Sequence, residues 1–231
     1  MTWARAAVIG ASGGIGAALA NHLAGSGAEV FRFSRGASGA SYLDLTDEAS
    51  IADAAQIAAR NGPLDLVIVA SGYLHGEGEG PEKDWRQITA GELSQNFAIN
   101  AIGPALVAKH FLPILADDRL AGLAALSARV GSISDNRLGG WYSYRASKAA
   151  LNMLIRTLSV ELARKKPEAF CVGLHPGTVD TRLSAPFQRG VPEGQLFTPD
   201  QTAQYLLDVL SKLSHADSGR CFAWDGKEIA P

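Results

Sequence analysis

A glycine-rich run from Gly10 to Gly16 joins two segments of different periodicity and leaves few folds open to this chain. Arg5 to Ile9, before it, is a short apolar run typical of a buried strand, whereas Ile15 to Ala24, after it, has the spacing of a helix. Where a strand turns into a helix, free amides and the positive end of the helix dipole point the same way, and glycines let an anion approach the backbone. The sequence therefore predicts a phosphate-binding turn made of Gly10, Ser12, Gly13, Gly14, Ile15 and Gly16.

The alternation of short apolar runs and longer periodic segments continues along the chain. We expect further strands at Ala28–Phe33, Tyr42–Leu45, Leu64–Ala70, Leu120–Ser127, Ala169–Leu174 and Cys221–Trp224. We expect further helices at Asp47–Arg60, at Gly91–Ala116 with an interruption at Pro104, at Tyr142–Arg164, and after Thr198, which can cap its helix together with Gln201. Strands that are continuously apolar indicate a parallel sheet covered by helices on both faces. The prediction is an α/β, single-domain Rossmann fold over residues 1–231, a doubly wound parallel sheet of about seven strands flanked by helices.

Composition limits the kind of partner. The chain has 21 basic and 23 acidic residues, without the basic stripe that nucleic acid or anionic lipid requires. Cys171 and Cys221 have no second ligand at metal spacing, so neither a metal site nor a disulfide framework is expected. Glycines interrupt the apolar opening segment, which argues against a signal peptide. We expect a cytoplasmic protein with a small-molecule partner, no nucleic acid and no membrane, and the low charged fraction of 19% agrees with a homo-oligomer.

The choice of cofactor depends on the end of the second predicted strand. NAD-binding folds usually carry an acidic residue there, which binds the ribose 2′-hydroxyl. This chain has Ser34 and Arg35 instead, and a hydroxyl beside a guanidinium suits a 2′-phosphate. The prediction is NADP(H), with NAD(H) as the alternative if Arg35 is only a solvated residue of a turn. A tight turn without any ligand is the alternative for the glycine run, whose G-x-x-x-G-x-G spacing differs from the G-x-G-x-x-G fingerprint.

Tyr144 and Lys148 stand four positions apart at the beginning of a strongly amphipathic helix. This spacing puts the phenol and the ammonium on one helix face. A nearby cation stabilises a phenolate and so lowers the pKa of a tyrosine from its ordinary value of about 10. Such pairs also occur on ordinary helix faces, so the pair predicts acid–base chemistry only in company with the glycine turn.

Taken together and in order, these motifs resemble the short-chain dehydrogenase/reductase family over essentially the whole chain. The resemblance rests on Gly10, Gly14 and Gly16, on Asp44, on Asn100, on Tyr144 with Lys148, and on Pro176-Gly177-Thr178 with Thr181. Gly131-Ser132-Ile133, the segment from Gly139 to Lys148, and Asp225-Gly226-Lys227 are similar to the sniffer-type carbonyl reductase branch. The set is specific for fold and cofactor but not for substrate.

The resemblance implies an NAD(P)-dependent oxidoreductase, with NADPH-dependent reduction of an aldehyde or ketone, or the reverse alcohol oxidation, and a homodimer or homotetramer. It implies that Tyr144 exchanges a proton with the substrate oxygen, that Lys148 binds the nicotinamide ribose, and that Asn100 holds a relay water. An asparagine that merely fills the kink before Pro104 is the alternative. The further cofactor contacts that the resemblance implies are Ser34, Arg35, Asp44, Leu45, Ala70, Ser71, Gly72, Pro176, Gly177, Thr178, Val179 and Thr181.

Two departures from the family pattern keep other interpretations open. Where the family commonly has Asn-Asn-Ala-Gly, this chain has Val69-Ala70-Ser71-Gly72, which predicts weaker cofactor binding. Motif alignment puts Ala128 in the place of the substrate-orienting serine, beside Ser127, whereas counting back twelve positions from Tyr144 predicts Ser132 for that role. The alternatives to Ser132 are Ser127 and no serine at all. A nucleotide-binding sensor or signalling protein with little or no turnover is the rival function.

A long segment without a periodic pattern, about 181–198, is predicted to be a lid over the substrate. Together with other apolar side chains it predicts a pocket mouth that suits a hydrophobic carbonyl compound. The residues expected there are Tyr73, Leu138, Trp141, Phe187, Leu196 and Phe197.

Overall fold

The computed structural model describes residues 3–76 and 80–231, apart from the side chains of Pro186 and Phe187. A parallel six-stranded sheet in the order β2-β1-β3-β4-β5-β8 forms its centre. The strands are β1 (Arg5–Ile9), β2 (Glu29–Phe33), β3 (Leu66–Val69), β4 (Ala121–Leu126), β5 (Ala169–His175) and β8 (Cys221–Ala223). The predicted α/β class with a parallel sheet is confirmed.

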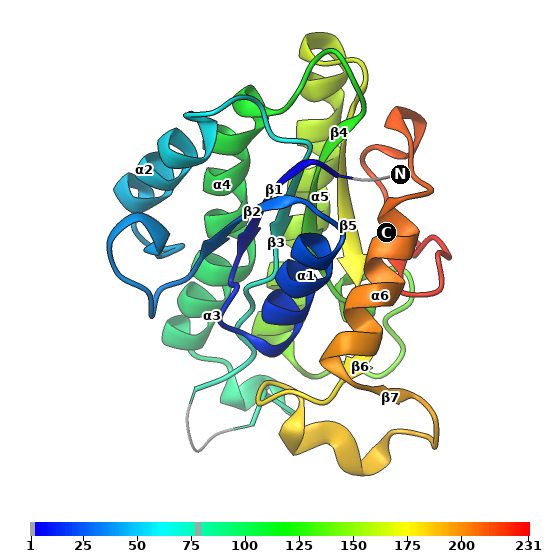
Figure 1. Cartoon of the computed structure of the whole chain (residues 1–231). Helices are drawn as coiled ribbons and strands as arrows, with labels where there is room; N and C mark the ends of the chain where they lie inside the picture. Colours follow the sequence, from blue (N-terminus) through cyan, green and yellow to red (C-terminus); the bar gives the residue numbers. More distant parts are fainter. Residues whose placement is uncertain (1–2, 77–79) are drawn as a thin grey trace.

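Helices cover both faces of the sheet (Figure 1). On one face lie α1 (Gly14–Gly25) and α6 (Pro199–Leu210). On the other face lie α2 (Glu48–Ala59), α4 (Gly103–Phe111) and α5 (Tyr142–Lys165). Each layer of helices buries an apolar face against alternate residues of the strands, which is why the strands are apolar on both sides. All residues of β3 and β4 are buried.

The strand predicted at Tyr42–Leu45 does not form, so the main sheet has six strands where about seven were expected. Tyr42 makes only an isolated bridge with Ser34. The Ser50 hydroxyl accepts from the amide of Asp44 at 3.0 Å, and the Asp44 carboxylate accepts from the amide of Thr46 at 2.9 Å. A local side-chain hydrogen bond thus occupies the amide of Asp44, which a ladder would need, as Asp and Ser often do.

The helix predicted at Gly91–Ala116 is divided into α3 (Ala90–Phe97), a π turn (Ala98–Ile102) and α4. The irregular hydrogen bonding begins ahead of the predicted break at Pro104. Because Pro104 has no N–H, the α-helical hydrogen bond to the carbonyl of Asn100 cannot form. Single π turns inside helices frequently occur at functional sites.

The stretch Ala90–Ile114 is also long and apolar enough, by composition alone, to cross a membrane, with a hydropathy of 1.3. Its residues Val107 and Phe111 belong to the core between the sheet and the helices. The core helix of a soluble protein passes the same test, so this composition is only weak evidence for a membrane span.

The segment between His175 and Phe197, predicted to be irregular, contains two short strands. β6 (Thr178–Val179) pairs with β7 (Leu196–Phe197) in a small parallel sheet of its own, and a 3-10 turn covers Ala185–Gly190 between them. The ring of Phe197 packs edge-on against Trp224 at 4.6 Å between centroids. The ends of the predicted lid are therefore held together, while the Phe187 side chain lies outside the described residues.

Candidate active site

The turn between β1 and α1 is open where the sequence predicts a phosphate. Ser12, Gly13 and Gly14 are exposed, and Gly10 has a φ of +86°, which favours glycine. The N-cap of α1 is Gly13, which has no side chain to satisfy the first amides of the helix. Those amides are available to an anionic ligand.

The phosphate cradle, which is the turn from Gly10 to Gly16, depends on the absence of side chains at Gly10 and Gly16. A Cβ at Gly16 would stand closer than 3.0 Å to the carbonyl oxygen of Gly10, and one at Gly10 would stand 2.6 Å from the hydroxyl of Ser71. Ser71 follows β3, and β2 and β3 lie on opposite sides of β1. The turn therefore lies at the point where the strand order reverses, where open α/β sheets bind ligands. Exposed amides and absent Cβ atoms fit a pyrophosphate group.

The predicted adenosine side lies beyond β2. Ser34 is half-buried and Arg35 is exposed. Burial raises the pKa of Asp44, but hydrogen bonds from the amide and hydroxyl of Thr46, with the Arg35 charge, outweigh it and hold that pKa below its ordinary value. Leu45 is buried against Gly103, where a Cβ would stand 2.6 Å from the Leu45 Cβ. Asp44 is thus an ionised acceptor near a guanidinium.

The side chain of Asn100 forms hydrogen bonds with the loop that follows β3. Its buried side chain accepts from the amide of Tyr73 at 2.9 Å and donates to the carbonyl of Tyr73 at 2.7 Å. The same Nδ2 lies 3.1 Å from Asn96 Oδ1 and 3.1 Å from the hydroxyl of Ser147. One amide group therefore joins the π turn, α5 and the loop after Ala70, Ser71 and Gly72. The family pattern has asparagines at the start of that loop, and this chain has none there. The relay water stays a prediction.

Tyr144 and Lys148 lie one turn apart near the start of α5, as their spacing predicts. Lys148 is 2% exposed, its Nζ donates to the carbonyl of Leu126 at 2.7 Å, and it lies 5.6 Å from the centroid of the Tyr144 ring. Burial raises the pKa of Tyr144 to about 12 and lowers the pKa of Lys148 to about 8. The sequence argument expected the cation to lower the phenol pKa, but here burial dominates, so the phenol is protonated at neutral pH.

The two candidate serines have other partners. The hydroxyl of Ser132 donates to the carbonyl of Pro231 at 3.3 Å and accepts from the amide of Asp135 at 3.2 Å. The hydroxyl of Ser127 donates to Asn152 Oδ1 at 2.6 Å. Among the described residues, neither hydroxyl forms a hydrogen bond with Tyr144. A substrate-orienting role for either serine requires it to exchange its present bond, and both assignments stay predictions.

The segment after β5 returns to the phosphate turn. Gly177 has a φ of +77°, and a Cβ there would stand 2.8 Å from the ring of Phe197. Farther along, the methyl group of Thr181 is so close to Gly14 that a Cβ on that glycine would stand 3.1 Å from it. The structure thus brings the predicted nicotinamide segment, which includes Pro176, Thr178 and Val179, against the predicted pyrophosphate cradle.

Comparison with known proteins agrees with this arrangement. The sequence model of the family described as short chain dehydrogenase matches residues 4–191. The chain belongs to the short-chain dehydrogenase family. The family that the sequence motifs predict is confirmed, and the protein is an oxidoreductase of that family.

Three relatives of this short-chain dehydrogenase are informative. "C-signal" of Myxococcus xanthus is 36% identical over 169 residues, which are 73% of this chain and 93% of that protein. The structure of an NADPH-bound carbonyl reductase from chicken fatty liver has a TM-score of 0.83 and 29% identity, and the match covers 100% of both chains. Carbonyl reductase Sniffer of D. melanogaster, with a TM-score of 0.81, 22% identity and 99% of each chain covered, shares the fold.

Sequence reasoning missed two polar residues around the site of this short-chain dehydrogenase. Asn152, the partner of Ser127, follows Lys148 by one helical turn, so the helix period could have indicated it. Glu82 is buried, and its carboxylate accepts hydrogen bonds from Ser143, 61 residues away in the sequence. No local pattern distinguishes Glu82 from the other acidic residues of its loop.

The buried Lys148 predicts how the stability of this short-chain dehydrogenase depends on pH. An unfolded lysine keeps its proton up to about pH 10.5, whereas the folded Lys148 loses it near pH 8. Between these values the unfolded chain binds more protons, so the Lys148 contribution to stability rises with pH. The unfolding free energy of the wild type, minus that of Lys148→Met, should rise by about 2 kcal/mol from pH 7.5 to 9.5.

Denaturant titrations of both proteins at the two pH values measure this difference. Lys165→Met is the control, because that lysine is 71% exposed and its loss should leave the difference flat. Parallel pH profiles for the wild type and Lys148→Met would show that Lys148 is not desolvated.

Proposed function

We propose that this short-chain dehydrogenase catalyses the NADPH-dependent reduction of an aldehyde or ketone, or the reverse oxidation of an alcohol. The carrying observation is geometric: Tyr144 lies one helical turn from the buried Lys148, whose Nζ stands 5.6 Å from the centroid of the Tyr144 ring. A phenol that stays protonated at neutral pH is ready to donate a proton. The glycine turn and the segment after β5 meet at the same end of the sheet, where a dinucleotide would bind.

Tyr144, Lys148 and Asn100 would each have a separate role in the reduction. When bound, the nicotinamide cofactor supplies the hydride that forms the new C–H bond at the carbonyl carbon. Tyr144 gives its phenolic proton to the carbonyl oxygen, which would otherwise become an alkoxide. The Lys148 charge stabilises the phenolate that remains, and a proton from solvent restores the phenol. Asn100 supports this return by holding a water at its main-chain carbonyl, to which Pro104 cannot donate a hydrogen bond.

NADP(H) is the proposed cofactor because of the residues that follow β2. Arg35 is exposed, so its guanidinium is free to meet a 2′-phosphate, and the half-buried Ser34 beside it offers a hydroxyl. The nearby Asp44 is in the loop that replaces the predicted strand, rather than at the end of β2. The chicken carbonyl reductase structure holds NADPH, which supports the same choice.

Replacing Arg35 by glutamate should therefore change cofactor preference. We expect the ratio of the NADPH and NADH dissociation constants to shift toward NADH by about 100-fold, because a favourable charge pair becomes a repulsive one. Fluorescence titration with both nucleotides measures the ratio. Arg60→Glu, the same charge change at an exposed residue just after α2, is the matched control. An unchanged ratio in Arg35→Glu would show that Arg35 does not touch the cofactor.

Apolar side chains near Tyr144 support a hydrophobic carbonyl substrate. The Trp141 ring meets the Tyr144 ring edge-on at 6.3 Å between centroids. Leu138 is 92% exposed in the loop before α5, and Leu196 is exposed at the base of the segment 181–198. We propose that these side chains form the mouth of the substrate pocket and that the segment 181–198 is its lid.

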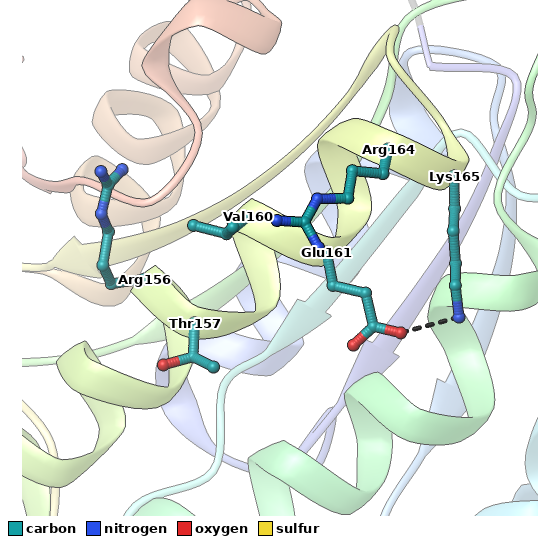
Figure 2. A pocket seen from close by; sticks show the side chains of 6 residues that line it. All are labelled: Arg156, Thr157, Val160, Glu161, Arg164 and Lys165. Carbon is teal, nitrogen blue, oxygen red and sulfur yellow. Dashed lines mark ion pairs between the residues drawn. The ribbon is translucent and has the colours of Figure 1, made fainter.

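The helix layer of α4 and α5 supports a homodimer or homotetramer. Ile102, Met153 and Val160 are apolar and exposed on or beside these helices. A hollow of about 570 Å³ lies along α5, lined by Arg156, Thr157, Val160, Glu161, Arg164 and Lys165. Figure 2 shows these side chains, among which Glu161 pairs with Lys165; the two charged atoms are 2.7 Å apart. The hollow begins twelve residues beyond Tyr144, about 18 Å along the helix, so it is separate from the candidate active site. We propose that this face meets a second copy of the chain.

A second candidate function is a nucleotide-binding sensor or signalling protein with little turnover. The relative named "C-signal" and the absence of a hydroxyl at Ala128 favour it. The two functions separate when purified protein with bound NADPH is mixed with a panel of aldehydes, ketones and diketones. Loss of reduced-nicotinamide absorbance that requires the protein supports the reductase, whereas tight NADPH binding without any loss supports the sensor.

A further inference from the structure

Helix α5 begins without a side-chain cap of its own. Its N-cap residue, Trp141, has a φ of 54° and is the single non-glycine residue with positive φ in the described chain. Gly139 and Gly140, just before it, have φ values of 63° and 65°. An indole cannot accept hydrogen bonds from the free amides of a first helical turn, which usually bind a side-chain oxygen. Partners for this turn must come from elsewhere in the fold.

Glu82, in the loop between β3 and α3, supplies those partners. Its Oε1 accepts from the amide of Ser143 at 3.3 Å and from the hydroxyl of Ser143, which is fully buried. Its main-chain carbonyl accepts from the amide of Trp141 at 2.5 Å. A Cβ at Gly140 would stand 3.3 Å from the same carbonyl oxygen, so the two loops touch along their backbones. Glu82 thus forms hydrogen bonds on both sides of Tyr142, the first residue of α5.

The burial of Glu82 is explained by this contact. The residue is 7% exposed, and its carboxylate forms no ion pair with any described residue. Removing a carboxylate from water is costly unless hydrogen bonds and charge replace the water. The N-terminus of the 24-residue helix α5 offers both, since its amides donate and its dipole favours a negative charge.

The two residues that Glu82 bonds are both close to Tyr144 and precede it in the chain. Ser143 is its neighbour in the chain, and Trp141 contacts its ring at an interplanar angle of 67°. Farther along α5, Leu151, Ile155 and Leu162 are in the core, so the helix as a whole is held without Glu82. The first turn, which carries the phenol, is the part of α5 that Glu82 contacts.

We propose that Glu82 is a positioning residue for Tyr144: its carboxylate caps α5 from a distant loop and so sets where the phenol meets the substrate oxygen. This inference rests on the proposed function of Tyr144 as proton donor. A displacement of about 1 Å in a reacting group can cost about 100-fold in rate. The effect of losing Glu82 should therefore fall on the chemical step rather than on the cofactor.

The test compares Glu82→Ala, Glu82→Gln and Asp84→Asn with the wild type. Glu82→Ala should lower kcat for the best carbonyl substrate by about 100-fold while the Kd for NADPH changes less than threefold. Glu82→Gln keeps an oxygen that can accept from Ser143, so it should retain kcat within about fivefold. Asp84→Asn is the matched control, because Asp84 lies in the same loop and its carboxylate bonds, among the described residues, Arg86 in its own short helix.

Hydrogen exchange at the amides of Ser143 and Tyr144 gives a readout that does not depend on turnover. It should be faster in Glu82→Ala and unchanged in Asp84→Asn. A Glu82→Ala protein that keeps kcat within threefold, or loses NADPH affinity as much as kcat, would overturn the positioning role, and unchanged exchange would overturn the cap. No turnover in the wild type with any carbonyl would instead overturn the proposed function, and exchange would still report whether Glu82 caps α5.

Discussion

Replacing Tyr144 by phenylalanine should lower kcat for carbonyl reduction by about 1,000-fold, with the Kd for NADPH unchanged within twofold. The substitution removes one hydroxyl and keeps the ring, so the edge contact with Trp141 remains. General acid catalysis by a positioned group contributes roughly 100- to 10,000-fold to a rate. With the proton donor gone, the developing alkoxide would have to be neutralised by water.

Tyr142→Phe is the matched control, because this half-buried tyrosine starts the same helix two residues earlier. Stopped-flow measurement of a single turnover, together with an NADPH titration, separates chemistry from binding. A Tyr144→Phe protein with more than a tenth of the wild-type rate would contradict the assignment of the phenol as proton donor.

Replacing Gly16 by alanine should weaken cofactor binding strongly, raising the Kd for NADPH by about 100-fold or more. The added methyl group would stand closer than 3.0 Å to the carbonyl oxygen of Gly10, which is main chain and cannot swing aside. Gly10 in turn packs on Ser71, so the turn cannot retreat without disturbing the end of β3. The amides that face the pyrophosphate would move apart.

Gly25→Ala is the control for this substitution. Gly25 ends the same helix, α1, and a Cβ there would meet nothing within 4 Å. Because alanine favours helix over glycine by about 1 kcal/mol, this variant should bind NADPH normally and melt no earlier than the wild type. Thermal melts and nucleotide titrations on both variants measure the contrast. Equal NADPH affinity in Gly16→Ala and Gly25→Ala would show that the turn does not hold the cofactor.

Elements determined by local chemistry were predictable from the sequence. β1 has the predicted bounds, Arg5–Ile9, because a short apolar run before glycines has few alternatives. The start of α6 is also as predicted, since Thr198 and Gln201 exchange hydrogen bonds at 3.1 and 2.9 Å between neighbours in the sequence. The strand at Tyr42–Leu45 does not form, because the Ser50 hydroxyl of α2 takes the amide of Asp44 and the Asp44 carboxylate closes a turn with Thr46.

The candidate site likewise has features that the sequence predicts and features that only the fold determines. The spacing of Tyr144 and Lys148 follows from the helix period, so the sequence alone brings them together. The direction in which the phenol pKa moves depends on burial by the whole fold, and the helix pattern could not show it. The bonds from Asn100 to Tyr73 and from Ser143 to Glu82 join residues 27 and 61 positions apart, so they appear only in three dimensions.

The most direct test of the central claim follows the hydride itself. Purified protein is given NADPH carrying deuterium at the transferable position of the nicotinamide, together with the carbonyl panel, and the products are analysed by mass spectrometry and NMR. The account predicts an alcohol with deuterium on the carbinol carbon, formed by the wild type and not by Tyr144→Phe. Tight binding of NADPH with no deuterated alcohol from any aldehyde, ketone or diketone would contradict the reductase function.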